Sequence, residues 1–577
     1  MTDRSPADWH PEPELISVRD EAASREALRD AGAAVWETAL DYLYEHAFGR
    51  AMGKTVDYDE LRAAFFGPSG GPAPAPVDPT TLRAVLDEFA IRVAPNTVSA
   101  YHPRSFGYFT PPPLLASVAG EVLAQVTQQG IDIWHAGPVG AFVEEEVLRW
   151  LCDLVGYGEG SFGILTSGGV MANFIAMALA RDVHAPRLLG DAEPPRGRAL
   201  EGMRVYASDQ THFSIGRALD ELGFPPETLV VIPADIDFRL RGAPVAAAIM
   251  RDRAMGFVPL AIAAVTGATN TGSVDAVGEL ADVAEREDMW LHVDAAYGAG
   301  ARLSPRDASR VPDLHRAHSV TVDPHKWLFQ AYDIGGLMVR DGSMLGQAFG
   351  GRRPEYYRAG HAPLSSAGAA DPAAARPGSL ADDSEVAGVD EANGTGPHHG
   401  DDDDGHGGAG QLNFWQLGFE GTRRWRALKL WLSWKHVGTT GFARLVEAND
   451  DLAAHLAERI AASDDFEALP AAPALSVVCF RHLPNGRAIA VPGTPAGRAL
   501  DAHQDRLQRE LEASGEGWLT TTRLRGATYL RAGIVNTQST VEDVDDLLEL
   551  LRKLAAGFVA SEPLGATGFA GMPDAGD

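Results

Sequence analysis

The sequence predicts an α/β fold, with a large domain around a mostly parallel β-sheet and a smaller α+β domain after it. The 577 residues exceed the roughly 100–200 of a typical domain, so the chain has room for both. Between about residues 100 and 345, short apolar runs alternate with stretches long enough to form helices. Strands joined by helix-length connections pair in parallel and are covered on both faces, which predicts the sheet.

Seven apolar runs are the expected strands of this sheet, and helical patterns flank them. Residues 14–65 and 80–93 show helical spacing and are separated by a Pro/Gly-rich linker. Residues 423–436 predict a further helix, and residues 450–560 mix helices with two more apolar runs. The expected strands are 163–165, 204–207, 229–232, 260–265, 290–293, 319–322 and 335–339 in the large sheet, and 475–480 and 528–534 in the small domain.

These patterns divide the chain into six parts. We expect an N-terminal helical segment (1–100), a large domain (101–366), an acidic insertion (367–410), a helical return (411–445), a small α+β domain (446–560) and a tail (561–577).

The net charge excludes two classes of partner. The chain has 49 Lys and Arg against 79 Asp and Glu, a formal charge of −30, which repels nucleic acid and anionic membranes. No apolar run reaches the roughly 18 residues needed to cross a bilayer, and the N-terminus lacks a signal-peptide pattern. Two cysteines cannot build a disulfide framework. We therefore expect a cytoplasmic enzyme.

Much of the negative charge is concentrated in residues 367–410. This stretch contains ten acidic residues and one Arg, is rich in Ala, Gly and Pro, and has no helix or strand pattern. Such a composition is typical of a disordered insertion. His398, His399 and His406 lie beside the acidic run, but without cysteines or an ordered scaffold they favour a solvated loop, and we expect no metal site.

The segment Asp323-Pro-His-Lys-Trp327 follows a predicted strand. A lone lysine is usually a solvated surface charge. Lys326, however, lies between an apolar strand and the apolar run that begins at Trp327. We expect desolvation to lower its pKa and make it a nucleophilic amine.

Three further segments end at strands of the same predicted sheet. Asp294 follows strand 290–293, Gly168-Gly169 follows the first strand, and His212 lies just after the second. Each alone has an ordinary explanation as a turn cap, a tight turn or a structural histidine. Together they supply a phosphate-binding turn, a flat side chain, a carboxylate and a lysine at the carboxyl edge of one sheet. That combination is what pyridoxal 5′-phosphate (PLP) needs.

The motifs resemble those of the PLP-dependent group II amino acid decarboxylases, and the pattern is most similar to the aromatic L-amino acid decarboxylases. The resemblance runs from about residue 102 to residue 555. It rests above all on His292-Val-Asp-Ala-Ala-Tyr297 together with Asp323-Pro-His-Lys-Trp327. It also includes segments 102–109, 208–212, 423–431 and 530–531. It implies the PLP-dependent transferase-like fold (fold type I) with a seven-stranded sheet, and a homodimer whose active sites lie at the subunit interface.

The resemblance also implies a role for individual residues. Lys326 would be the Schiff-base lysine, Asp294 the partner of the pyridine nitrogen, and His212 the side chain stacked on the cofactor ring. The remaining implied contacts are Ala296 on the other ring face, Ser167, Gly168, Gly169, Asp323 and His325 around the phosphate, Thr269 near the 3-oxygen, and Tyr108, Phe109 and Thr110 around the substrate side chain.

Two positions depart from the family pattern. Asp323 stands where members often have Asn, which places a second anion near the phosphate. Ungapped alignment places Phe414 where aromatic amino acid decarboxylases carry a tyrosine that protonates Cα. Phe cannot donate a proton, and related enzymes with Phe there yield aldehydes. The alternatives are that Phe414 only packs, or that Tyr356 or Tyr357 serves instead.

The expected function is PLP-dependent decarboxylation of an L-amino acid to its amine and CO₂. Tyr108, Phe109 and Trp134 favour an aromatic substrate over an acidic one. The alternatives are an aromatic aldehyde synthase, a decarboxylase of an acidic or other amino acid, another carbon–carbon lyase or aminotransferase of this fold, and a cofactor-binding protein without activity.

Overall fold

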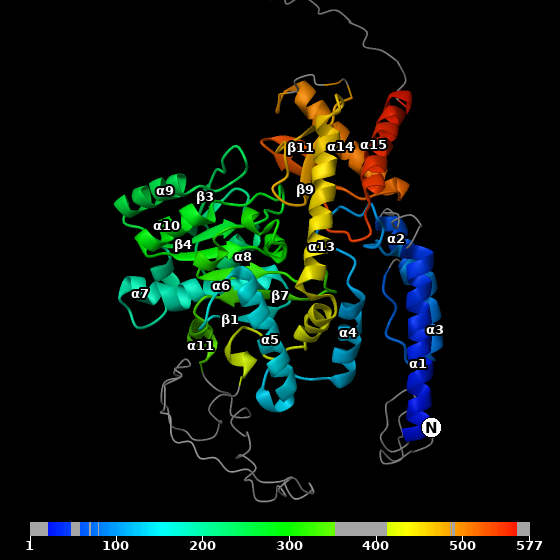
Figure 1. The fold of residues 1–577 in the computed structure, drawn as a ribbon, viewed down its shortest axis with the longest axis horizontal. Helices are drawn as coiled ribbons and strands as arrows, with labels where there is room; N and C mark the ends of the chain where they lie inside the picture. The colour runs from blue at the N-terminus through cyan, green and yellow to red at the C-terminus, as the bar shows by residue number, and fades with distance from the viewer. Residues whose placement is uncertain are drawn as a thin grey trace, which may run out of the picture. The chain divides into compact units, whose positions relative to one another are not determined.

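The computed structural model describes residues 21–47, 58–67, 71–78, 80–351, 412–484, 486 and 491–561, drawn in colour in Figure 1. The predicted insertion, most of the predicted tail, Tyr356 and Tyr357 lie outside these residues. The chain forms two compact units. The large-sheet unit comprises Pro113–Thr269 and Ser273–Arg444, and the small-sheet unit comprises Met1–Pro112, Asn270–Gly272 and Leu445–Asp577. The six-part division expected from the sequence remains a prediction.

The large-sheet unit contains a seven-stranded, mostly parallel sheet, as the sequence predicts (Figure 1). Its strand order is β1-β7-β6-β5-β4-β2-β3, and β7 pairs antiparallel with both β1 and β6 while the remaining pairs are parallel. Every predicted strand is present. The bounds are β1 Phe162–Thr166, β2 Met203–Ser208, β3 Leu229–Ile232, β4 Val258–Val265, β5 Trp290–Asp294, β6 Ser319–Val322 and β7 Gly335–Val339.

Helices cover both faces of this sheet. On one face, α6 and α8 share an apolar core with alternate residues of the strands, such as Val205 and Ala207 of β2. On the other face, α9 and α10 contact β4 and contribute no residue to that core. The bounds are α4 Leu115–Thr127, α5 Pro138–Val155, α6 Gly169–Leu179, α7 Ala185–Leu189, α8 Ser214–Glu221, α9 Gly242–Ala254, α10 Val277–Glu287 and α11 Ser343–Phe349.

Local sequence explains where several of these helices begin and end. Helix α5 begins at Pro138, whose missing N–H has no partner to lose in the first turn, and stops at Gly156, which takes the left-handed conformation. After α11, the described chain resumes at residue 412 and forms the short helix η14 (Phe414–Gln416), which contacts α11. The two sides of the undescribed segment 352–411 therefore lie close together.

The small-sheet unit contains a four-stranded antiparallel sheet in the order β10-β11-β9-β8. Its core combines residues of the sheet, such as Phe480, with Leu507 of α14 and Leu547 of α15. The predicted strands 475–480 and 528–534 correspond to β9 and β11. The bounds are α1 Glu21–Tyr42, α2 Tyr58–Phe66, α3 Leu82–Glu88, β8 Phe466–Ala468, β9 Val477–His482, α14 Pro495–Ser514, β10 Thr520–Leu524, β11 Ala527–Gly533 and α15 Val541–Ser561.

Helix α13 (Ala427–Ala461) begins later than the sequence predicts. The predicted start was residue 423, but the backbone of Arg423–Arg426 precedes the helix, and the guanidinium of Arg423 reaches the carboxylate of Glu144 and the carbonyl oxygen of Leu165 instead. The helix is also interrupted at Gly438, which has a left-handed φ of 66°. Within the described ranges, no helix has both the length and the apolar character needed to cross a membrane.

Candidate active site

The carboxyl ends of the parallel strands form one edge of the large sheet, and most of the predicted site residues lie there. Ser167, Gly168 and Gly169 follow β1, and His212 lies four residues after the end of β2. Asp294 ends β5, and Asp323, His325 and Lys326 follow β6. Ligands of open α/β sheets bind at this edge, so the strand order itself assembles the candidate site.

Lys326 forms an ion pair with Asp323, whose Oδ2 lies 3.1 Å from the lysine Nζ. The Lys326 side chain is partly exposed, whereas Asp323 is buried. Burial lowers the pKa of the Lys326 ammonium, but the carboxylates of Asp323 and Asp294 outweigh it and raise the pKa above its ordinary value. The predicted lowering of this pKa is therefore wrong, because the apolar surroundings contain two anions.

Asp294 is connected to His212 by a chain of buried hydrogen bonds. Asn173 of α6 donates from Nδ2 to Asp294 Oδ2 and to Ser214 Oγ, each at 2.8 Å. Ser214 Oγ lies 2.8 Å from His212 Nδ1. The second oxygen of Asp294 accepts the backbone N–H of Ala296 at 3.1 Å. Burial lowers the pKa of His212, with Lys326 adding to this effect and Asp294 opposing it.

The Gly-Gly turn before α6 passes close to this set. A Cβ on Gly169 would lie 2.9 Å from Asp323 Oδ2 and 3.4 Å from Ala296 Cβ, and one on Gly168 would lie 3.3 Å from the His325 ring. Only a residue without a side chain leaves this space open. The first N–H groups of α6 have no partner within the helix, so the turn is suited to bind an anion.

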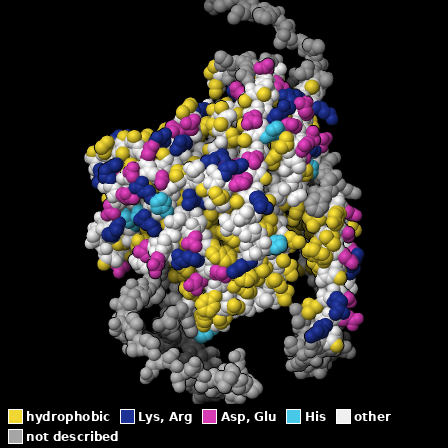
Figure 2. All heavy atoms as spheres, viewed as in Figure 1, with side chains coloured by type: hydrophobic (Ala, Val, Ile, Leu, Met, Phe, Trp, Pro, Cys, Tyr) yellow, Lys and Arg dark blue, Asp and Glu magenta, His cyan; other side chains and the backbone are white. Residues whose placement is uncertain are grey.

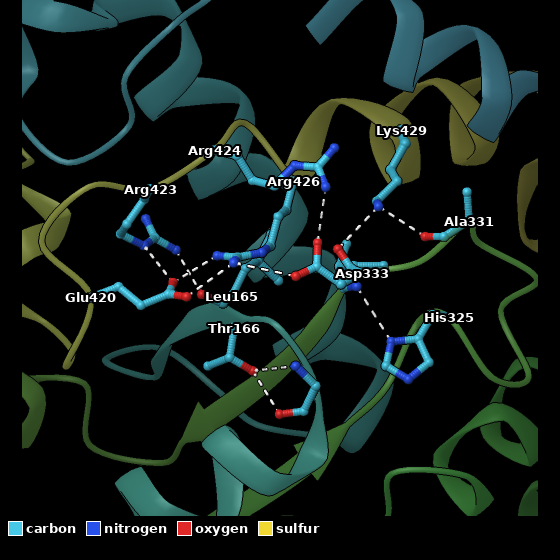
Figure 3. Close-up of polar contacts among 12 residues, drawn as sticks. Leu165, Thr166, His325, Ala331, Asp333, Glu420, Arg423, Arg424, Arg426 and Lys429 are labelled. Carbon is cyan, nitrogen blue, oxygen red and sulfur yellow. Dashed lines mark hydrogen bonds and ion pairs between the residues drawn. The ribbon is translucent and has the colours of Figure 1, made fainter. Parts of the chain in front are cut away.

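His325 is held by the loop that leads into β7. Its Nδ1 accepts the backbone N–H of Ile334 at 3.3 Å, and its Nε2 lies 3.7 Å from Asp323 Oδ2 (Figure 3). Burial lowers the pKa of His325, and the nearby Asp323 opposes this. A neutral ring with its proton on Nε2 therefore faces the Asp323 carboxylate.

An ion network fixes the same loop to the start of α13 (Figure 3). Asp333 pairs with Arg424 at 3.1 Å and with Arg426 at 3.5 Å. Lys429 donates to the carbonyl oxygens of Ala331 and Asp333 at 2.8 and 3.0 Å. The network thus holds residues 331–334, and through Ile334 it holds His325.

Beside this network, Arg423 and Glu144 form a fully buried ion pair at 2.6 Å, and Arg423 also donates to Leu165 O at the end of β1. Burial raises the pKa of Glu144, and Arg423 opposes this. Replacing Arg423 alone leaves a buried carboxylate without a cation, so we expect Arg423→Met to lower the free energy of unfolding by about 3–5 kcal/mol.

The double variant Arg423→Met/Glu144→Leu is the control, because it removes both charges. We expect it to recover most of the loss in denaturant unfolding. A single variant as stable as the wild type contradicts a structural role for this pair.

The remaining predicted residues lie elsewhere. Thr269 is exposed after β4. Tyr108, Phe109 and Thr110 belong to the small-sheet unit, where Tyr108 contacts the Trp518 ring and Phe109 lies under the Arg531 guanidinium. Their roles remain predictions.

Phe414 has a clear structural role. It is fully buried, stacks on Phe162 with ring centroids 6.3 Å apart, and lies under the guanidinium of Arg423 at 5.0 Å. The structure supports the alternative in which Phe414 packs. Its identity therefore carries no information about a proton donor.

Sequence reasoning missed Asn173, Ser214, Glu144 and the loop 331–334. A signal was present for Asn173, which interrupts the apolar stretch of α6, because a polar residue inside such a helix needs buried partners. Nothing local identifies those partners, since Asp294 lies 121 residues from Asn173 and Glu144 lies 279 residues from Arg423.

Comparison with known proteins decides the family. The model of the pyridoxal-dependent decarboxylase conserved domain matches residues 69–366 and 400–483. The chain belongs to this family. It is a PLP-dependent amino acid decarboxylase, and PLP is its cofactor.

Relatives within the family act on different substrates. The chain is 29% identical over 94% of its length to an aromatic-L-amino-acid decarboxylase of Bacillus atrophaeus, of which it covers 98%. It is 29% identical over 84% of both chains to an L-2,4-diaminobutyrate decarboxylase of Rhizobium meliloti. It is 28% identical to a phenylacetaldehyde synthase of Petunia hybrida, with 71% of this chain and 72% of the relative covered.

Solved structures of the family share the fold. The glutamate decarboxylase domain of a diaminobutyrate-pyruvate transaminase and L-2,4-diaminobutyrate decarboxylase from Vibrio parahaemolyticus has a TM-score of 0.72 and 25% identity, with 94% of this chain and 97% of that chain covered. A structure from Oryza sativa titled TDC with PLP and tryptamine has a TM-score of 0.75 and 22% identity, with 94% and 100% covered.

The residues at the sheet edge of this decarboxylase fit PLP. The open Gly168-Gly169 turn suits the phosphate, Lys326 offers a partly exposed amine, and the Asp294 carboxylate is held in place by hydrogen bonds from Asn173 and the Ala296 backbone. The feature that fits least is Asp323, because its buried Oδ1 has no hydrogen-bond partner in the described structure and its charge lies beside the phosphate space.

Proposed function

We propose that this enzyme converts an aromatic L-amino acid to its amine and CO₂, with Lys326, Asp294 and His212 as the catalytic residues. The observation that carries this proposal is the placement of all three at one sheet edge, with Asp294 and His212 joined through Asn173 and Ser214. The similarity to an aromatic-L-amino-acid decarboxylase over 94% of the chain supports the substrate class.

The chain's own residues divide the work. Bound PLP supplies an electron-withdrawing ring that accepts the electron pair released when the bond from Cα to the carboxylate breaks. Lys326 holds the cofactor through Nζ, and Asp294 holds a proton on the pyridine nitrogen. His212 and Ala296 lie against the two ring faces, and Ser167, Gly168, Gly169 and His325 hold the phosphate. Thr269 contacts the 3-oxygen, and Tyr108, Phe109 and Thr110 surround the substrate side chain.

The substrate is tested with a panel of L-amino acids, in which CO₂ release and the organic product are both measured. We expect the aromatic members to be turned over with the highest kcat/KM and to yield equal amounts of amine and CO₂. Turnover of 2,4-diaminobutyrate or glutamate without turnover of aromatic substrates contradicts the substrate class. Aldehyde, ammonia and peroxide in place of amine contradict simple decarboxylation, as in the aldehyde synthase alternative.

Asp323 offers a second test of the site, because it pairs with Lys326 and opposes binding of an anion. We expect Asp323→Asn to lower the raised pKa of Lys326, so that the neutral amine forms at lower pH. The rate at which PLP-free protein captures PLP, followed by visible absorbance, should then become half-maximal at lower pH than in the wild type. A midpoint that stays in place or moves upward contradicts the pairing.

We also propose that two copies form a homodimer through the face of α4 and α5. Large apolar side chains are exposed there, including Leu115, Val122 and Val126 of α4 and Val139 and Phe142 of α5. Figure 2 shows hydrophobic side chains gathered over these helices. An exposed apolar patch of this kind marks an interaction surface.

The oligomeric state is tested by light scattering. We expect the wild type to have twice the mass of one chain and Val126→Glu to shift toward a single chain. A wild type that runs as one chain contradicts the proposal.

A further inference from the structure

Asn173 uses every hydrogen-bonding position of its side chain. The residue is fully buried. Besides the two donated bonds to Asp294 and Ser214, its Oδ1 accepts from Thr321 Oγ1 at 2.7 Å and lies 2.9 Å from His292 Nε2. An amide group has two donors and two acceptor positions, and all four are used.

The charges around Asn173 allow one orientation of its amide. Asp294 presents a carboxylate oxygen, which only accepts, so the NH₂ group must point toward it. The opposite orientation would bring two oxygens together at 2.8 Å. The oxygen of the amide therefore faces Thr321 and His292, and the NH₂ group faces the cofactor side of the sheet edge.

This orientation decides the proton position on His212. Ser214 Oγ accepts one N–H from Asn173, so its own hydrogen is left to point at His212 Nδ1. The backbone N–H of Ser214 also points at Nδ1, at 3.4 Å. Because both neighbours donate, Nδ1 is an acceptor and the ring proton lies on Nε2. Burial lowers the pKa of His212, which agrees with a neutral ring.

We propose that Asn173 is the positioning residue of the cofactor site, which orients the Asp294 carboxylate with one N–H and, through Ser214, holds His212 in its Nε2–H form with the other. This inference rests on the proposed roles of Asp294 and His212. It extends them, because a single side chain outside the reacting groups then controls both the charge at the ring nitrogen and the donor that His212 offers.

The test is the isosteric variant Asn173→Asp, which keeps an acceptor toward Thr321 and His292 but replaces the NH₂ group with oxygen. Two carboxylate oxygens would then face each other where Nδ2 and Asp294 Oδ2 now lie 2.8 Å apart, so the pair must share a proton and Asp294 loses charge. We expect the dissociation constant of PLP, titrated into the PLP-free full chain, to rise at least tenfold. We also expect the pH dependence of the bound cofactor's visible band to change.

Asn536→Asp is the matched control. Asn536 is also buried, and its Nδ2 also donates to two oxygens, those of Ala100 and His102 at 3.1 and 2.7 Å, but it belongs to the small-sheet unit. We expect this variant to lower the unfolding temperature while the PLP dissociation constant stays within threefold of the wild type. An equal loss of PLP affinity in both variants overturns the proposal, as does an Asn173→Asp variant that binds PLP like the wild type.

If Asn173→Asp does not fold, Ser214→Ala decides. This variant keeps the bond from Asn173 to Asp294 and removes only the hydroxyl that faces His212. We expect PLP affinity within threefold of the wild type and kcat at least tenfold lower. An unchanged kcat overturns the proposal. Failure of the proposed function is a separate outcome, because it appears as a wild type that releases no CO₂ from aromatic substrates.

Discussion

Lys326→Ala should abolish CO₂ release and the visible absorbance of bound PLP. The lysine amine is the only candidate for the covalent bond to the cofactor at this sheet edge among the described residues, and its Nζ lies 3.1 Å from Asp323 beside the Gly-Gly turn. Alanine removes both the bond and the cation that balances Asp323. We therefore expect no measurable turnover with any amino acid, together with a shift of the absorbance spectrum toward that of free PLP.

Lys435→Ala provides the control for loss of a lysine. Lys435 is half exposed on α13 and pairs with Glu146 at 2.9 Å, away from the sheet edge. An exposed pair contributes little to stability, so this variant should keep wild-type turnover and absorbance. A Lys326→Ala enzyme that still releases CO₂ from its substrate would remove the basis for the assigned mechanism.

Asp294→Asn should lower kcat by about 100–1000-fold, the range found when one preorganised electrostatic contact is lost from an active site. The change keeps the shape of the side chain and removes the charge that holds a proton on the pyridine nitrogen. Without that proton, the ring accepts the electron pair poorly when CO₂ leaves. Steady-state kinetics and the pH dependence of the visible band measure the two effects separately.

Asp275→Asn tests whether the loss of any buried carboxylate has the same result. Asp275 is buried and accepts the backbone N–H groups of Leu240 and Val265, each at 2.7 Å. Burial raises its pKa to about 7, so the neutral amide resembles a state that the wild type already populates. We expect a lower unfolding temperature and an unchanged visible band. A loss of kcat equal to that of Asp294→Asn would mean that the effect is structural.

The large sheet was predictable because its strands are buried on both faces, which leaves continuous apolar runs in the sequence. Two strands of the small sheet were missed for the opposite reason. Strand β10 (Thr520–Leu524) is polar and alternates between partly buried and exposed positions, and β8 (Phe466–Ala468) has three residues, as expected of strands at the edges of a sheet.

The candidate site was predictable in its residues but not in its electrostatics. The motifs placed Lys326, Asp294 and His212 at one edge, because parallel strands end together. The direction of the Lys326 pKa shift depends on the side chain of Asp323 turning toward the amine, which no local pattern reveals. The role of Asn173 depends on four partners from four other segments, and only the folded chain brings them together.

The contact between α11 and η14 has a consequence for protein engineering. The chain leaves the large-sheet unit after α11 and re-enters it at η14, and these two helices touch. A short connection can therefore replace residues 352–411 without stretching the backbone on either side, and new termini can be opened there by circular permutation. Such a rearranged chain would show whether folding of the unit and turnover of substrate can be separated.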